Sequence, residues 1–254
     1  MLTTKVEHFI GNVEQNFSNY RNLVKDLESS VYTYCELQGH QNPIGQRIED
    51  LTANEVKWVI QEYSQFSNEA IHMLLDARIR VHEWTDLSEE IDRNIEEEKG
   101  SETKGVPHLE IMRMGYQIGL DFDVNNYNPS EITKTFLSLM KKIFRKKENA
   151  YVAGALLAFE SISIPEFHIL DALAKKYQVD RGIIRRNDYL RDYIDGHKVF
   201  EVGHKEGLMK AIEPYIWHHQ SREFSAGYLA VCMTVSNWWG NLNEEITRKK
   251  LQNV

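Results

Sequence analysis

The chain has 254 residues, of which 42% are hydrophobic and 27% charged, and its formal net charge at pH 7 is −8. This length and apolar content suit one large domain or two small ones with an ample core. The negative charge argues against sequence-independent nucleic-acid binding, which depends on clustered Lys and Arg, and the apolar runs are too short and too interrupted to cross a bilayer. We therefore expect a globular protein without a nucleic-acid partner or a membrane span.

The N-terminal segment has the pattern of a helix rather than that of a secretory leader. It reads MLTTKVEHFIGNVEQNF, with acidic residues where a leader needs a basic start and an apolar block. Only Cys35 and Cys232 are present, and they form neither a disulfide framework nor a CxxC pair. These features predict a cytoplasmic protein, with residues 1–38 as accessory helices packed on the core and residues 39–254 as the main helical domain.

A long amphipathic helix is predicted first, because apolar residues recur at three- and four-residue steps between residues 51 and 84. Thr52 is its expected N-cap, and Glu55 completes a capping box. The next helix is predicted to start at about Ser88 and to stop at the turn-rich segment GSETKG. Pro107 then stands in the first turn of a further helix, where a missing N–H is tolerated.

The rest of the chain is also helical in pattern. Ser130 is a candidate N-cap, and the basic run KKIFRKKE at 141–148 is expected to be the solvated start of a helix rather than a binding patch. The helical segments are EITKTFLSLMKKIF, NAYVAGALLAFESI, IPEFHILDALAKKY, NDYLRDYIDGHKVFEVGHKEGLMKAI and REFSAGYLAVCMTVSNWWGNL. No β-strand alternation persists for five residues, so about eight to ten helices with short loops predict an all-α, single-domain fold. Trp238 and Trp239 are expected in core packing or a dimer contact.

The segment HKVFEVGH contains the first candidate site. His197, Glu201 and His204 stand at positions i, i+4 and i+7, which project from one face of a helix. Two imidazoles and a carboxylate suit iron, manganese or zinc and leave open positions on the metal. The alternative is a polar helix face that is merely solvated. A metal site would need further ligands from other segments.

Acids in unusual surroundings supply such ligands. Glu160 ends the apolar run AYVAGALLAFE, so we expect it to be buried and therefore protonated, paired or metal-bound. The alternative is that the helix ends at Phe159 and Glu160 reaches water. In NIEEEKG, one of Glu97 and Glu98 can face inward while its neighbour stays in water, and His108 follows after a loop.

Together these candidates are three carboxylates and three imidazoles on separate helices. That is the ligand set of a dinuclear iron centre inside a helical bundle, where inward-facing Glu and His bind both metals. Two ferrous ions bring four positive charges, and three carboxylates offset three of them. The residues therefore predict a buried site for two metal ions.

The pattern resembles a known family, the heme-oxygenase-like diiron oxidases, and in particular its CADD-like members. NIEEEKG with the later PHLEIMRMG resembles that family's Asn-x-x-Glu-Glu-x-Gly segment and the ligand His that follows it. GALLAFE resembles its middle ligand helix, and HKVFEVGH resembles its closing His-x-x-x-Asp-x-x-His. The resemblance covers about residues 40–220. It implies a TenA- and PqqC-like helical bundle, often homodimeric, that uses two Fe ions and O2 to oxidise a small amino acid, fatty acid or aromatic precursor.

Carried over position by position, the resemblance implies a set of iron ligands: Glu98, His108, Glu160, His197, Glu201 and His204, with Glu97 as the alternative to Glu98. The family usually has Asp at the position of Glu201, and one extra methylene changes how the carboxylate approaches its metal. Some members add an acid from the preceding long helix. Glu62 and Glu69 are the positions available here, and we favour neither.

Two other functions fit the same fold. A thiaminase-II-like (TenA-type) hydrolase uses a Cys nucleophile, but Cys232 lies in the apolar segment YLAVCMTV, a setting that raises the pKa of a thiol and argues against that use. A non-enzymatic CADD-like helical interaction protein would carry the acids and histidines as surface decoration. It would bind no metal and consume no oxygen.

Overall fold

The structure is a computed structural model that describes residues 10–11, 17–39, 41–183 and 188–252. Within these ranges all regular structure is helical, which confirms the predicted all-α fold. The α-helices are α2 (Tyr20–Val31), α3 (Pro43–Gln46), α4 (Ala53–Arg80), α5 (Thr85–Glu98), α6 (His108–Leu120), α7 (Glu131–Phe144), α8 (Asn149–Arg181), α9 (Asp188–Ile212) and α10 (His218–Gln252). Three single turns of 3-10 helix, η1 (Cys35–Leu37), η2 (Ile48–Asp50) and η3 (Glu213–Tyr215), lie in connections.

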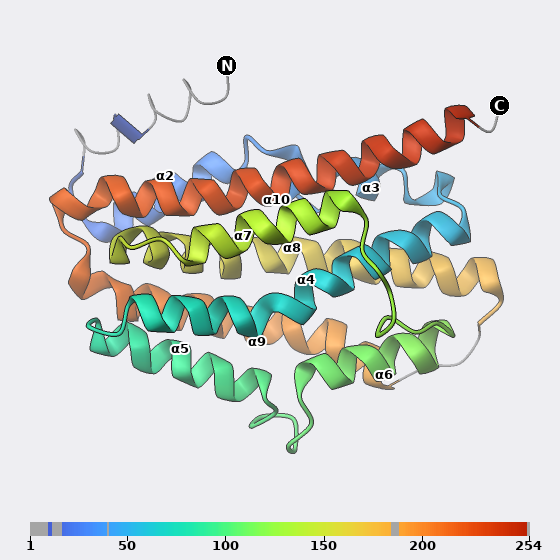
Figure 1. Ribbon diagram of the computed structural model, residues 1–254, viewed down its shortest axis with the longest axis horizontal. Coiled ribbons are helices and arrows are strands. Elements are labelled where there is room, and N and C mark those ends of the chain that lie inside the picture. The colour runs from blue at the N-terminus through green and yellow to red at the C-terminus, as the bar shows by residue number, and fades with distance from the viewer. Residues whose placement is uncertain (1–9, 12–16, 40, 184–187, 253–254) are drawn as a thin grey trace.

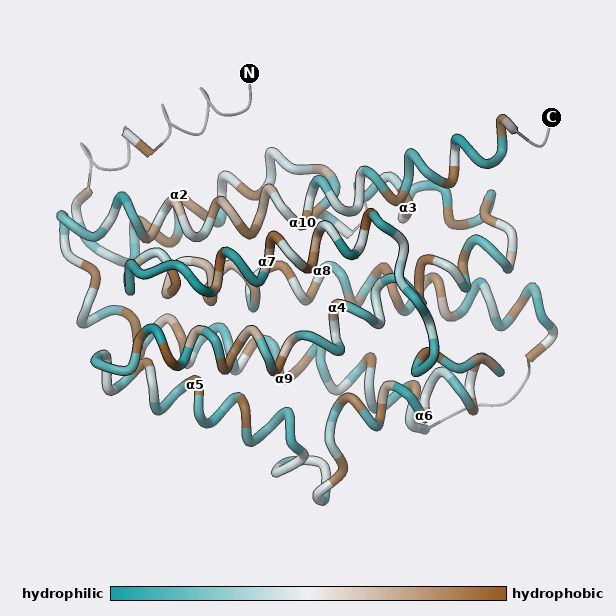
Figure 2. The backbone as a smooth tube through the Cα atoms, viewed as in Figure 1, coloured by the Kyte–Doolittle hydropathy of each residue, from teal (hydrophilic) through white to brown (hydrophobic). Residues whose placement is uncertain are grey.

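Helix α8 is the centre of the bundle. It packs against α10, α9 and α4, and it is buried along most of its length. Figure 1 shows α7 and α10 above α8, with α4 and α9 below it and α5 and α6 at the lower edge. Along each helix hydrophobic positions recur among hydrophilic ones (Figure 2), the pattern of amphipathic helices around one core. By length and composition α8 alone, among the described helices, could span a membrane, yet 72% of its apolar window is buried by the other helices.

The predicted helix starts hold in most places. The Thr52 hydroxyl accepts from the N–H of Glu55, whose side chain accepts from Thr52 in return, so the capping box is formed. Ser130 caps α7, and α6 begins directly after Pro107. The predicted start at Ser88 is wrong by about one turn, because α5 begins at Thr85. The Ser88 hydroxyl does not cap α5 but donates to the carbonyl of Val81, at the end of α4.

Two further predictions need correction. The run at 141–148 forms the end of α7 and the link to α8 rather than the start of a helix, and its lysines there complement the negative end of the α7 dipole. The segments on either side of Pro165 were expected to be separate helices, but α8 runs through the proline. A proline inside a helix costs about 3 kcal/mol. Residues of α8 are buried on both sides of Pro165, and the packing of the helix against α10, α9 and α4 outweighs that cost.

Two glycines set the distance between α8 and α10. A Cβ on Gly154 would lie 2.0 Å from the Phe224 carbonyl oxygen, and one on Gly227 would lie 1.8 Å from that of Tyr151. The backbones therefore approach more closely than any side chain would allow. Across this contact Trp239 of α10, which is fully buried, donates its indole N–H to Glu166 of α8 at 2.7 Å.

The described part of the N-terminal segment lies on the core. Helix α2 packs against α10, and an ion pair between Glu28 and Lys205, 2.6 Å long, joins it to α9. Residues 1–9 and 12–16 lie outside the described part of the chain. The division of the chain at residue 38 stays a prediction.

Candidate metal centre

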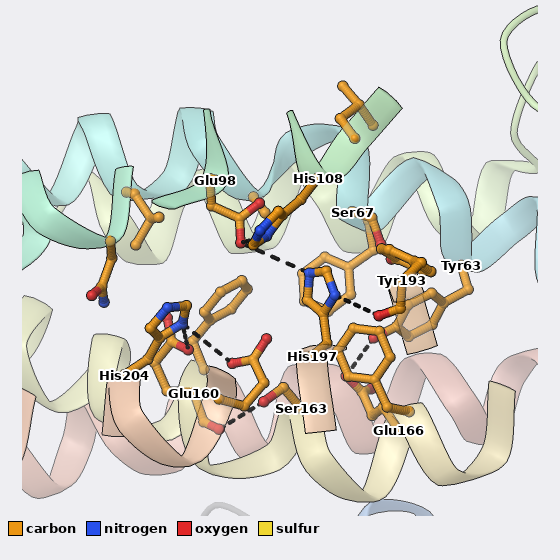
Figure 3. A pocket seen from close by; sticks show the side chains of 18 residues that line it. Tyr63, Ser67, Glu98, His108, Glu160, Ser163, Glu166, Tyr193, His197 and His204 are labelled. Atoms are coloured by element: carbon orange, nitrogen blue, oxygen red, sulfur yellow. Dashed lines mark hydrogen bonds and ion pairs between the residues drawn. The ribbon is translucent and has the colours of Figure 1, made fainter. Parts of the chain in front are cut away.

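A buried cavity of about 60 Å³ lies between α4, α5, α6, α8 and α9. All six residues proposed from the sequence line it: Glu98, His108, Glu160, His197, Glu201 and His204. They divide into two triads, and within each triad one possible ligand atom per residue lies within 4.8 Å of the others. Figure 3 shows five of these side chains, those of Glu98, His108, Glu160, His197 and His204, pointing into the cavity from both sides. Long-range packing thus unites residues that are more than 100 positions apart in the chain.

The histidine-rich triad consists of Glu98, His108 and His197, from α5, α6 and α9. The Glu98 Oε1 atom lies 3.2 Å from His108 Nδ1 and 3.9 Å from His197 Nε2. Atoms that share one metal at the usual ligand distances of about 2.0–2.2 Å are about 3–4 Å apart. The spacing of these three groups therefore suits a common ion.

A tight turn after α5 brings His108 back to Glu98. Gly100 has a φ of +104°, which L-residues rarely adopt, and a Cβ there would lie 2.6 Å from the backbone of Val106. Its N–H donates to the Glu97 carbonyl, 2.8 Å away, and closes the end of the helix. The glycine of NIEEEKG thus lets the following loop fold over the helix end, so that α6 starts beside the last turn of α5.

The carboxylate-rich triad consists of Glu160, Glu201 and His204, from α8 and α9. His204 Nδ1 lies 3.5 Å from Glu160 Oε2 and 3.8 Å from Glu201 Oε2. Burial and the charge of Glu160 raise the pKa of Glu201 to about 7. Although burial opposes it, the two carboxylates raise the pKa of His204 to about 12. Two adjacent buried acids thus hold a positive charge between them.

Helix α9 presents its three candidate residues as the spacing predicted. His197, Glu201 and His204 are all buried on one face, whereas Val199 is 69% exposed and Val202 is 45% exposed on the other. The polar face is therefore the inward one, because here it faces the acids of α5 and α8. A face that was only solvated would have the opposite arrangement.

Glu97 and Glu98 take different positions. Glu98 belongs to the histidine-rich triad, while Glu97 Oε2 accepts from His204 Nε2 at 2.6 Å. Arg93 forms an ion pair with Glu97 and with Glu90 as well. His204 thereby keeps Nδ1 free to face the cavity, the arrangement by which an outer carboxylate orients a metal-binding imidazole.

The imidazole of His197 is fixed in a similar way. Its Nδ1 donates to the Tyr193 carbonyl at 2.7 Å, which leaves Nε2 to face Glu98. Burial lowers the pKa of His197, so the neutral ring that metals bind is favoured. In His108, Nε2 is buried and has no protein partner among the described residues. An orphaned imidazole nitrogen in a cavity lined by three candidate carboxylates fits a site for cations.

The two α4 acids considered as additional ligands lie outside the triads. Glu62 accepts from the N–H of Ser130 at 3.0 Å and from the Tyr127 hydroxyl, so it anchors the start of α7. Glu69 forms an ion pair with Lys141 at 2.9 Å. The α4 residues that line the cavity instead include Ser67. Neither Glu62 nor Glu69 lines the cavity or belongs to a triad.

The structure also bears on the two other functions. Cys232 is fully buried, burial raises the pKa of its thiol, and it is not among the residues that line the cavity. A thiolate nucleophile is therefore disfavoured. The acids and histidines are not surface decoration, because five of the six are buried and the sixth, Glu98, has a side chain only 17% exposed.

Sequence reasoning missed several residues of the cavity wall. Asn94, quoted above only as part of NIEEEKG, is fully buried, and both polar atoms of its amide lack a partner among the described residues. Tyr63, Tyr193 and Glu166 line the same cavity. The signal for Glu166 was present in the sequence, since it is an acid in an apolar helix as Glu160 is. The tyrosines gave none, because aromatic residues at helical spacing usually belong to the core.

Comparison with known proteins agrees with this geometry. Residues 21–245 match the family DUF3865, a domain of unknown function with a solved structure. A crystal structure of a CADD-like protein of unknown function from Nostoc punctiforme is 28% identical, with a TM-score of 0.83 over 89% of this chain and 97% of that one. A second crystal structure of that protein gives 27% and 0.80. The resemblance to CADD-like proteins is therefore confirmed.

A distant relative has a named activity. The 4-chloro-allylglycine synthase of Streptantibioticus cattleyicolor is 28% identical over 159 residues, which are 61% of this chain. The match covers 58% of the length of that synthase. Kinship with a biosynthetic enzyme, together with two buried triads that could hold metal ions, indicates an enzyme.

Proposed function

This chain belongs to the DUF3865 family, and from that premise we propose that it is a non-heme diiron oxidoreductase that uses O2 to oxidise a small organic substrate. The observation that carries the proposal is the pair of triads, which bring three carboxylates and three imidazoles to one buried cavity. The solved CADD-like relative supports the fold, and the synthase supports an enzymatic role.

The donor set favours a redox-active metal. Glu98, His108 and His197 would hold one ion, and Glu160, Glu201 and His204 the other. Mixed carboxylate and imidazole donors suit iron and manganese, whereas sites for Mg²⁺ or Ca²⁺ are built from oxygen atoms. Bound ferrous iron would supply the electrons and the open coordination positions that reduction of O2 requires.

The protein itself orients the metal ligands and excludes water. The ion pair between Arg93 and Glu97 fixes His204, the Tyr193 carbonyl fixes His197, and the turn at Gly100 fixes His108. Aromatic side chains close the wall beside them, and they keep bulk water from a reactive centre. The pocket is thus preorganised before any metal binds.

The size of the cavity favours a small substrate. Pockets for drug-sized ligands are typically about 300–1,000 Å³, far above the cavity of about 60 Å³ seen here. Of the substrate classes considered above, a small amino acid fits this space better than a fatty acid. The name of the distant synthase also denotes an amino-acid product, which supports the same choice.

The first experiment is anaerobic reconstitution with Fe(II), followed by elemental analysis and Mössbauer spectroscopy. Wild type should bind two coupled irons per chain, and Glu160→Ala and His197→Ala should lose one or both. Matched controls are Glu69→Ala and His72→Ala, which remove an acid and an imidazole outside the cavity. Equal iron in all five proteins, or none in any, would overturn the proposal.

Exposure to O2 provides a second readout. The iron-loaded wild type should consume O2 and develop a transient visible absorbance that the two cavity variants lack. Protein treated with a metal chelator should neither consume O2 nor develop the absorbance.

A homodimeric assembly is proposed as well, and light scattering in solution would test it. The cytoplasmic location stays a prediction.

A further inference from the structure

Glu166 is a buried acid that none of the six proposed metal ligands touches. It lies on α8 and is 2% exposed, and its carboxylate forms part of the cavity wall. Its Oε1 accepts from the Trp239 indole at 2.7 Å, and its Oε2 accepts from the Tyr63 hydroxyl at 3.3 Å. Figure 3 shows it near Tyr63 and Tyr193, with Glu160 and His204 toward the other end of the cavity.

No cation of the described protein neutralises this carboxylate. Its hydrogen-bonding partners are two neutral donors, and the charged group that acts on it is another acid, Glu201. Burial accordingly raises the pKa of Glu166 to about 8, so the empty cavity favours the neutral acid, and a positively charged group bound beside it would favour the carboxylate. A buried acid without a cation is costly, and its companion in proteins is usually a metal or a positively charged group.

The surroundings suit an ammonium group rather than a metal ion. The rings of Tyr63, Phe167 and Tyr193 line the same part of the cavity, and aromatic faces attract organic cations. No imidazole or second acid is grouped with Glu166 in a candidate metal cluster of the described residues. One carboxylate among aromatic rings is a poor metal site, but it is a good partner for a primary amine.

We propose that Glu166 anchors a positively charged nitrogen of the substrate, so that the substrate is an aliphatic amine or amino acid whose ammonium group lies at the Glu166 end of the cavity. The inference rests on the proposed function, in which this cavity is the substrate site. It excludes plain fatty acids and neutral aromatic precursors, which would leave the buried acid without a partner.

The geometry also limits the length of the substrate. Glu160 and Glu166 are six residues apart, or about 9 Å along the axis of α8. An extended chain advances about 1.2 Å per bond, and a contact at each end takes part of the span. The carbon to be oxidised should therefore lie about three to six carbons from the nitrogen.

Calorimetry with n-alkyl ligands tests the inference directly. The probes are primary n-alkylamines from two to eight carbons, with the n-alcohol and n-carboxylate of each length, and the protein is the full chain with and without anaerobic Fe(II). Wild type should bind the best amine at least about tenfold tighter than the matched alcohol, as expected for a charge-assisted hydrogen bond. Equal affinity for amine and alcohol in wild type would overturn the inference, whatever the variants do.

Two substitutions separate anchoring from structural support. Glu166→Gln keeps an acceptor for the Trp239 indole but removes the charge, so it should lose the preference for amines and leave alcohol binding unchanged. Trp239→Phe keeps the charge and should retain the preference. Glu28→Gln, at an acid on the other side of α8, is the matched control. An amine preference that survives Glu166→Gln would refute the anchor.

Failure of this inference differs from failure of the proposed function. Iron stoichiometry of Glu166→Gln should equal that of wild type, because Glu166 is outside both triads. Two irons with no amine preference would leave the oxidoreductase standing and remove the anchor. Amine binding that depends on Glu166, in a protein that takes up no iron, would support the anchor and overturn the proposed oxidoreductase.

Discussion

The two triads of the cavity are built in different ways. The histidine-rich triad takes its residues from α5, α6 and α9, and it depends on the turn at Gly100 to return His108 to Glu98. The carboxylate-rich triad takes its residues from two helices, α8 and α9, which pack along the core. It also has an outer support, since Glu97 holds His204 in place.

The two triads also differ in their net charge. Once a metal ion displaces the protons of Glu201 and His204, the histidine-rich triad has one negative charge and the carboxylate-rich triad has two. The second therefore attracts a divalent cation more strongly, and its supporting groups are already ordered. We expect the carboxylate-rich triad to fill first as Fe(II) is added, and the histidine-rich triad to fill second and lose its metal sooner.

The largest effect is expected from Glu201→Ala. Glu201 belongs to the carboxylate-rich triad, and its charge also acts on Glu98 and His197 of the other one. Its removal should weaken the first metal by more than the roughly 10–100-fold typical of losing an outer partner, and should lower the total below one iron per chain. Elemental analysis after anaerobic loading and desalting measures this. Two irons retained would show that Glu201 is not a ligand.

His108→Ala should affect the histidine-rich triad alone. His108 donates nothing to the second triad, so the variant is expected to keep one iron in place of two, with the magnetic coupling lost. Mössbauer spectroscopy distinguishes one uncoupled iron from a coupled pair. If both irons disappeared together, the two triads would form one inseparable site and the comparison would fail.

Glu97→Gln should have a smaller and selective effect. The Gln side chain can still contact His204, but it lacks the negative charge that orients the imidazole ring. The affinity of the carboxylate-rich triad for iron should therefore fall by about 10–100-fold. Affinity at the histidine-rich triad should stay unchanged, as competition titrations with a metal chelator would show. A change at the histidine-rich triad instead would make Glu97 a ligand of that site. Glu96→Gln, at the neighbouring exposed acid, is the control.

The smallest effect is expected on the stability of the metal-free protein. The dependence of that stability on pH should have opposite signs for the two triads. The pKa of Glu201 is raised from 4.5 to about 7, mainly by burial, so its contribution to stability is present at low pH and is lost as pH rises toward 7. The pKa of Glu98 is lowered, despite its burial, by hydrogen bonding to His108, so its contribution is present above pH 4.5 and is lost as pH falls below that value.

Chemical denaturation across pH 3–8 of wild type, Glu201→Gln and Glu98→Gln compares these contributions. Relative to wild type, Glu201→Gln should gain stability as pH rises, and Glu98→Gln should lose it. The same sign in both variants would mean that the triads share one electrostatic environment.

Local sequence predicted much of this arrangement. The capping box at Thr52 and the cap at Ser130 depend on neighbours within three residues, and both are formed. The spacing of His197, Glu201 and His204 depends only on helical geometry, and the three share a buried face. Burial of Glu160 followed from the apolar run before it. Each of these features involves one segment, so the sequence alone contained the information.

Tertiary packing decided the rest. Glu97 and Glu98 are adjacent in sequence, and only the approach of α9 assigns one to His204 and the other to the cluster with His108. Pro165 would end an isolated helix, yet α8 continues through it because the helix packs against α10, α9 and α4. The sequence by itself determined which side chains could bind metal and on which helix face each stands. Their union in one cavity depends on contacts between helices far apart in the chain, and no local pattern encodes those contacts.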